Sequence, residues 1–438
     1  MRNKSLQWLY SELPQLVKAG VLSEDAAASL RSHYGEARAG GRGLWISICA
    51  VLGSLLIGAG VILLLAYNWT DFSRGVRTLL SFAPLLTAQG IAIWVFFSRR
   101  DGVALREGVA LFWSLAVASS IALIGQTYHI PGDMGGFLLV WACLVLPLIY
   151  LMRSTVVAML FLVIITSWSG HSQERGGDAL AFWLLLAGVL PYVVCSTRAS
   201  RYAPSTAWLG WALSLCLCCG TGIALEKVMP GLWIVIYASL FGVLYLAGSY
   251  WFDDAPTDWQ KPYHVIGAGG IATMTFLLTM EWAWDDVGWR YYRYGYCYNS
   301  SAAWIDYAFA VLLPIAAICL LVTAVRRRES TRLLFGVMPI VAILGFCLVA
   351  FGVDDLAPMI LFNIYAFVLG VGCIYLGGRS GRLAIVNAGM VMVTALIVAR
   401  FFDVDLGLVA RGLAFILIGV SFLATNLVVA KRAKARVT

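Results

Sequence analysis

The feature that most constrains this chain is a series of apolar runs that begins near residue 44 and continues almost to the end. About fourteen runs follow one another, and most approach the ~20 residues that a helix needs to cross a bilayer. Their approximate limits are 44–66, 78–97, 107–125, 136–152, 155–168, 179–196, 205–224, 230–250, 264–282, 304–325, 333–352, 357–376, 383–401 and 406–430. The fifth run is short for a span. The pattern predicts an all-α, polytopic bundle of transmembrane helices.

Composition supports this prediction. Of the 438 residues, 61% are hydrophobic and only 12% are charged, about half the charged share of a soluble globular protein. These values exclude a soluble enzyme and a disordered chain. All but one of the ten cysteines lie within apolar runs, so no disulfide framework is expected.

The basic residues predict the orientation in the membrane. If the N-terminus is cytoplasmic, 23 Lys and Arg residues fall on the cytoplasmic side of the bilayer and six fall outside. Cytoplasmic loops normally carry this excess. Both termini are therefore predicted to be cytoplasmic. The net charge of +8 is explained by topology, and the expected partner is the lipid bilayer rather than nucleic acid.

The sequence suggests three segments. Residues 1–43 are polar and are predicted to form a cytoplasmic helical hairpin, residues 44–430 the transmembrane domain, and residues 431–438 a basic cytoplasmic tail. In the hairpin, Gly20 can close the first helix, and Ser23 can cap a second helix that ends near Tyr34. This hairpin could bind a protein partner or a second copy of the chain.

Charged residues inside a bilayer cost free energy and therefore mark candidate sites. The strongest cluster is Arg400, Asp403, Asp405 and Arg411, at the turn between the last two runs. One hypothesis is a gate or an ion or proton site whose charges couple to transport. The other is a salt-bridged clamp that joins two helices, which is favoured because charges near span ends reach the interface at low cost.

A second candidate is the outer turn GQTYHIPGD, with Gln126, Tyr128, His129 and Asp133. His129 could titrate near neutral pH, and Asp133 could pair with it or with a cation. Alternatively, the polar groups only satisfy the backbone of a Pro-Gly turn.

Other signals are weaker. The outer loop 282–304 is rich in Trp and Tyr, which favours the membrane interface over an aromatic ligand platform. Gly267, Gly269 and Gly270 are expected to allow close helix approach. The CLCCG sequence at 216–220 could bind a soft metal, but consecutive positions face different sides of a helix. No catalytic motif is present, so neither an enzyme, a cofactor nor a metal site is expected.

Three segments resemble a family of bacterial predicted membrane proteins of unknown function. They are LPQLVKAGVLSEDAAASLRSHYG near the N-terminus, the GQTYHIPGD turn with the run after it, and the closing ARFFDVDLGLVARG. The resemblance implies an inner-membrane location and an N-terminal cytoplasmic helical domain. It implies no activity and assigns no catalytic residue.

The expected function is passage of a small solute or ion between the helices, as in a transporter or channel. The alternative is a membrane scaffold or sensor whose hairpin at residues 1–43 binds a partner.

Overall fold

The computed structural model describes most of the chain between residues 12 and 403. The described residues are 12–14, 16–17, 19–34, 69, 71–97, 103–175, 180–225, 231–284, 287, 303–327 and 330–403, together with 416, 419, 420 and 423. The chain divides into two compact units, Met1–Leu80 and Ser81–Thr438. The expected run 44–66, nearly all of 406–430 and the expected domain boundary at residue 43 lie outside the described residues.

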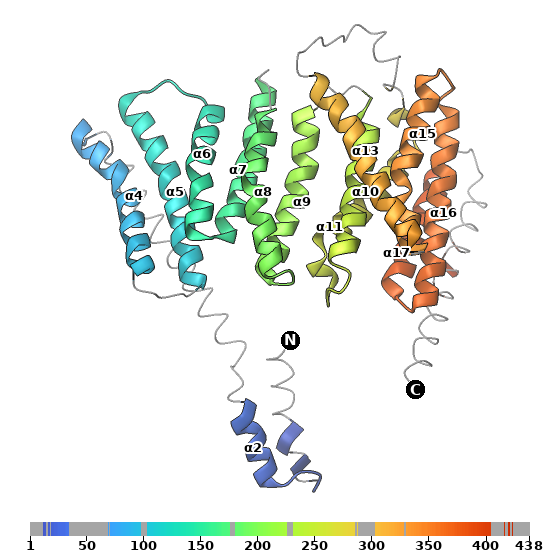
Figure 1. Cartoon of the computed structure of the whole chain (residues 1–438), viewed down its shortest axis with the longest axis horizontal. Coiled ribbons are helices and arrows are strands. Elements are labelled where there is room, and N and C mark those ends of the chain that lie inside the picture. Colours follow the sequence, from blue (N-terminus) through green and yellow to red (C-terminus); the bar gives the residue numbers. More distant parts are fainter. Residues whose placement is uncertain are drawn as a thin grey trace. The chain divides into compact units, whose positions relative to one another are not determined.

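The described residues form helices and no strand, which confirms the all-α prediction (Figure 1). The α-helices are α2 (Glu24–Tyr34), α4 (Arg74–Phe97), α5 (Val103–Tyr128), α6 (Met134–Met152), α7 (Thr155–Glu174), α8 (Ala181–Ala199), α9 (Pro204–Leu225), α10 (Trp233–Trp251), α11 (Pro262–Leu277), α13 (Ala303–Arg326), α14 (Ser330–Gly336), α15 (Met338–Ala350), α16 (Leu356–Ser380) and α17 (Leu383–Asp403). Two short 3₁₀ helices cover Asp258–Gln260 and Glu281–Ala283.

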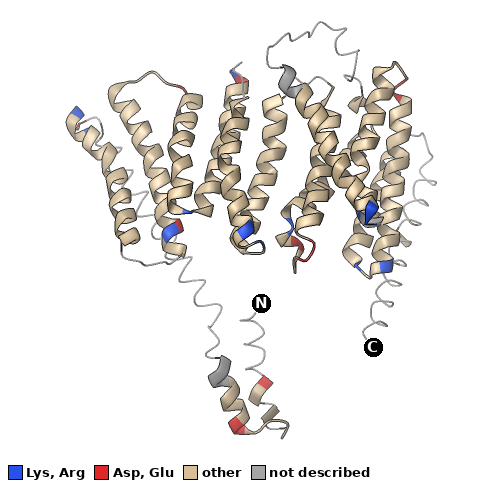
Figure 2. Cartoon of the chain, viewed as in Figure 1, with Lys and Arg blue, Asp and Glu red and all other residues tan. Residues whose placement is uncertain are grey.

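In the described part of the chain, eleven helices are long and apolar enough to cross a membrane. The doubtful fifth run is among them, because α7 continues past residue 168 to Glu174 and reaches 20 residues. The expected run 264–282 is shorter than predicted, since α11 ends at Leu277 after 16 residues. In the described helices, Lys, Arg, Asp and Glu lie mostly at or near the helix ends, and the middles consist of other residues, as a bilayer favours (Figure 2).

The described residues of the first unit include the turn and the second helix of the predicted N-terminal hairpin. Gly20 adopts a left-handed conformation with φ of 68°, and its N–H donates to the Val17 carbonyl at 3.0 Å. Ser23 Oγ accepts from the Ala26 N–H at 3.2 Å, and α2 ends at Tyr34. Gly20 and Ser23 therefore adopt the conformation and the capping hydrogen bond that the sequence predicts.

Within the second unit, neighbouring helices pack tightly where glycine removes a side chain. A Cβ added at Gly267 on α11 would lie 2.4 Å from the backbone nitrogen of Tyr245 on α10. Gly270 likewise faces the Phe241 ring, whereas a Cβ at Gly269 would meet nothing within 4 Å. The expectation of close approach is confirmed for the first two glycines and is wrong for Gly269, which points away from the contact.

Trp284 departs from the expectation of an interfacial aromatic loop. Its side chain is fully buried, its Nε1 donates to the Leu278 carbonyl at 3.0 Å, and its ring packs against Phe362. Trp282 is 60% exposed, as expected for the interface. Most of the loop after Trp284 lies outside the described residues.

Candidate functional site

The turn between α5 and α6 is built by local rules that its sequence makes visible. Gln126 and Tyr128 end α5, and both are exposed. His129 adopts a left-handed conformation with φ of 51°, which lets the Ile130 N–H return to the Gly125 carbonyl at 2.9 Å. This bond closes the C-terminal end of a helix, and a proline follows it, as is common. Asp133 then caps α6 by accepting from the Gly136 N–H at 3.0 Å.

The second oxygen of the Asp133 carboxylate faces the end of α7. Arg175 Nη1 donates to Oδ2 at 3.0 Å, and His171 Nε2 lies 4.0 Å from the same oxygen. The His171 ring lies close to α6 because residue 135 is glycine, where a Cβ would lie 3.3 Å from His171 Cδ2. The structure therefore pairs Asp133 with Arg175 and places His171 nearby, and it does not pair Asp133 with the neighbouring His129.

The electrostatics of Asp133 follow from these contacts. The Gly136 N–H is the largest influence and lowers the pKa of Asp133 below its ordinary value of 3.8. Partial loss of water opposes this shift, and the positive charge of Arg175 reinforces it. Asp133 is therefore ionised at neutral pH, and its negative charge is balanced by Arg175.

A cavity of about 1200 Å³ opens beside this turn. Ile130, Gly132 and Asp133 of the turn line the end that we call its mouth, and the lining residues continue along α6 to Leu144. Leu144 lies eleven positions after Asp133, which is about 16 Å of helix, roughly half of a ~30 Å hydrocarbon core. Its walls come from three helices. They include Phe82, Leu85 and Gln89 of α4, Trp113, Val117 and Ser120 of α5, and Phe137 and Val140 of α6.

At the opposite end of α6, where α7 begins, a carboxylate that the sequence analysis did not identify accepts several hydrogen bonds. Glu107, in the first turns of α5, accepts from the Thr155 N–H at 2.9 Å and from the Val156 N–H at 3.1 Å. It also accepts from the Ser154 hydroxyl, while Ser154 Oγ caps α7 by accepting from the Val157 N–H. Glu107 thus accepts hydrogen bonds from the free N–H groups at the start of α7, and its negative charge is favourable at the positive end of the helix dipole. The only sequence signal was a lone acidic residue at the edge of an apolar run.

The C-terminal candidate cluster is described only in part. Arg400 on α17 donates to the Thr279 carbonyl and lies 3.8 Å from the Met280 sulfur, so it ties α17 to the segment after α11. Asp403 is the last residue of α17, but its side chain lies outside the described residues. Asp405 and Arg411 also lie outside them. The expected clamp and gate therefore stay predictions.

Metal ligation finds no support in the described residues, where no three His, Cys, Asp or Glu side chains come together as a metal site would need. Cys216 accepts instead from the Thr166 hydroxyl at 3.1 Å.

The turn, the cavity and both carboxylates fall within the part of the chain that matches a family of predicted membrane proteins. Residues 14–158 match the family described as Predicted membrane protein (DUF2157). The match confirms the resemblance noted in the first two segments, whereas the closing ARFFDVDLGLVARG lies beyond the matched residues. With the apolar helices, the match supports a membrane protein of unknown function. Arg175 and His171 lie beyond the matched residues. No curated protein and no solved structure matches the chain.

Proposed function

We propose that this protein moves a small uncharged or amphiphilic solute across the membrane, and that the cavity between α4, α5 and α6 receives the solute. One observation carries the proposal. A cavity of about 1200 Å³ with a polar mouth extends along α6 as far as Leu144. A bundle that only served as a scaffold has no use for such a space.

The wall chemistry argues for an uncharged solute over an ion. Phe82, Trp113 and Phe137 present aromatic surface, and Gln89 is the one amide side chain among the described lining residues. An ion would have to leave water for this apolar surface at a large cost. The charge of Asp133 at the mouth is balanced by Arg175, so it offers no excess attraction for a cation.

The interior of the described bundle supports the same choice. Its buried polar residues are all Ser or Thr. Several return their hydroxyls to their own helix, as Ser114 does to the Ala110 carbonyl and Ser214 to the Gly210 carbonyl. The hydrogens of such hydroxyls are already used, so these groups offer no donor to a dehydrated anion.

Transport can be tested with purified protein in liposomes. Uptake would be measured for N-acetyltryptophanamide as an uncharged amphiphile, glycerol as an uncharged polar solute and rubidium as an ion. We expect uptake of the amphiphile above that of protein-free liposomes, and no gain for rubidium. Equal rates with and without protein for the amphiphile and glycerol would overturn the proposal.

A matched pair of variants assigns any uptake to the cavity. Val117→Trp places a large ring in the cavity, whereas Leu115→Trp makes the same change on the exposed side of α5, outside the lining. We expect Val117→Trp to bring uptake close to the protein-free rate and Leu115→Trp to leave it within about twofold of wild type. The same loss in both variants would count against the cavity as the route.

The alternative function, a membrane scaffold or sensor, concerns the predicted N-terminal hairpin. Residues 1–43 could bind a partner protein or a second copy, and crosslinking of the full chain in its membrane would detect this. The location also stays a prediction. We expect both termini at the cytoplasmic face of a bacterial inner membrane, which reporter fusions to each terminus would check.

A further inference from the structure

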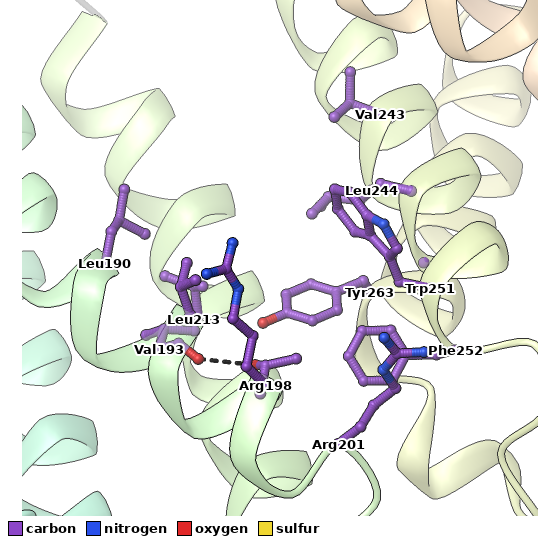
Figure 3. A pocket seen from close by; sticks show the side chains of 14 residues that line it. Leu190, Val193, Arg198, Arg201, Leu213, Val243, Leu244, Trp251, Phe252 and Tyr263 are labelled. Atoms are coloured by element: carbon purple, nitrogen blue, oxygen red, sulfur yellow. Dashed lines mark hydrogen bonds between the residues drawn. The ribbon is translucent and has the colours of Figure 1, made fainter.

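A second cavity, of about 520 Å³, lies far along the chain from the first. Residues of α8 and α10 form most of its wall, with Leu213 from α9 and Tyr263 from α11 (Figure 3). Its volume falls within the ~300–1,000 Å³ of sites that hold small molecules. Most of the lining is apolar, as at Leu190, Val193 and Leu244.

Two arginines stand at one end of this apolar wall. Arg198 lies in the last turn of α8, Arg201 follows in the loop to α9, and both line the cavity. Both are exposed, and neither guanidinium makes a hydrogen bond or an ion pair with any described residue. In contrast, Arg175 pairs with Asp133 and Arg332 with Asp253.

The rest of the lining leaves these two charges uncompensated. No Asp or Glu is among the residues that line the cavity in the described part of the chain. Tyr263 lies between the two arginines in the view of Figure 3, with its hydroxyl directed toward the Arg198 side. That hydroxyl makes no hydrogen bond with a described residue, so a third donor faces the same space.

This combination selects a ligand with an anionic end and an apolar body. Guanidinium groups bind phosphate oxygens with paired N–H donors. A soluble anion would leave the apolar wall uncovered, and a neutral lipid would leave the arginines without partners. Basic pockets between transmembrane helices near the membrane surface are known to bind anionic lipid headgroups. Trp251, which is 59% exposed beside the cavity, suits the interface where such a headgroup lies.

We propose that this cavity binds an anionic phospholipid. The phosphate lies between Arg198 and Arg201, within reach of the Tyr263 hydroxyl, and one acyl chain lies along Leu190, Val193 and Leu244. The site is separate from the proposed solute cavity, and it regulates or stabilises the bundle whether or not solute is transported.

The test is lipid binding to the full chain in detergent, measured by native mass spectrometry. Phosphatidylglycerol and phosphatidylcholine with the same acyl chains would be titrated in parallel, with glycerol phosphate as a free-phosphate competitor. We expect tighter binding of phosphatidylglycerol and no competition by glycerol phosphate at millimolar concentration. Equal binding of the two lipids would overturn the proposal, and full competition by glycerol phosphate would replace the lipid with a soluble phosphate.

Three variants locate the binding. Arg198→Gln with Arg201→Gln removes both charges, and we expect phosphatidylglycerol to bind about tenfold or more weakly. The control is Arg326→Gln with Arg382→Gln, which removes two exposed arginines outside the cavity and should leave binding unchanged. Ala247→Phe fills the apolar part and should weaken binding with both arginines intact. Thermal unfolding without added lipid would confirm that each variant folds. The same loss in both double variants would mean a general charge effect and would overturn the site.

Discussion

Two regions of the second unit hold their helices together by different means. Around α5, α6 and α7, two carboxylates bind free N–H groups at the helix starts, and both act at the ends of the helices. Between α10 and α11, the backbones themselves touch, because Gly248 and Gly267 have no Cβ. A Cβ at Gly248 would lie 2.4 Å from the His264 nitrogen. The carboxylates thus act at the helix ends, and steric packing acts along the facing sides of two helices, a contact that matters where lipid tails provide no hydrophobic driving force.

We expect substitutions at the contact between α10 and α11 to destabilise the protein more than substitutions around α5, α6 and α7. Gly267→Ala places a methyl group 2.4 Å from the Tyr245 nitrogen and 2.7 Å from its Cα, and a backbone neighbour cannot rotate away. We expect this change to lower the free energy of unfolding by about 3 kcal/mol, measured by denaturation in mixed micelles.

Gly269→Ala is the matched control on the same helix, because its Cβ would meet nothing within 4 Å. It should change the free energy of unfolding by less than about 1 kcal/mol. Similar losses at both positions would show that backbone contact is not what holds α10 to α11.

Around α5, α6 and α7, we expect the loss of Glu107 to have the second-largest effect on stability. Glu107→Ala leaves the Thr155 and Val156 N–H groups and the Ser154 hydroxyl without their shared acceptor. We expect a loss of about 2 kcal/mol in the free energy of unfolding and faster hydrogen exchange of the backbone amides at the start of α7.

The control for Glu107 is Glu174→Ala, at the exposed end of α7, which should change stability by less than about 0.5 kcal/mol. If the two substitutions behave alike, the Glu107 contacts do not stabilise the turn.

We expect Asp133→Asn to have the smallest effect on stability of the three substitutions, and we expect this effect to depend on pH. Its pKa is lowered in the folded protein, chiefly by the Gly136 N–H. Its contribution is therefore complete above the ordinary value of 3.8 and is lost as the pH falls through the lower folded value. Between about pH 5 and pH 3, the melting temperature of Asp133→Asn should fall less than that of the wild type.

Parallel pH profiles for wild type and Asp133→Asn would contradict this assignment. Arg175→Gln provides a further comparison. Because the Gly136 N–H is the larger cause of the shift, this variant should keep most of the wild-type pH dependence.

Much of the candidate site could be foreseen where the contacts are local. The left-handed residue, the proline and the capping Asp133 of the α5–α6 turn all lie within nine residues of GQTYHIPGD. The hairpin at Gly20 and Ser23 was predictable for the same reason. The partners of Asp133 were not, because Arg175 is 42 residues away and only the packing of α7 against α6 brings it near. Glu107 meets Ser154 across 47 residues, so no local pattern could reveal it.

The sequence by itself determined the helical class, most of the spans and the turn at Gly20 and Ser23, because apolar run length and capping residues act over a few residues. Only the tertiary structure decided which helices touch, that Gly267 and Gly270 face a neighbour while Gly269 does not, and that Trp284 is buried. It also created both cavities. Each depends on side chains from three or more helices, and the relative rotation of those helices is set by packing that hydropathy does not encode.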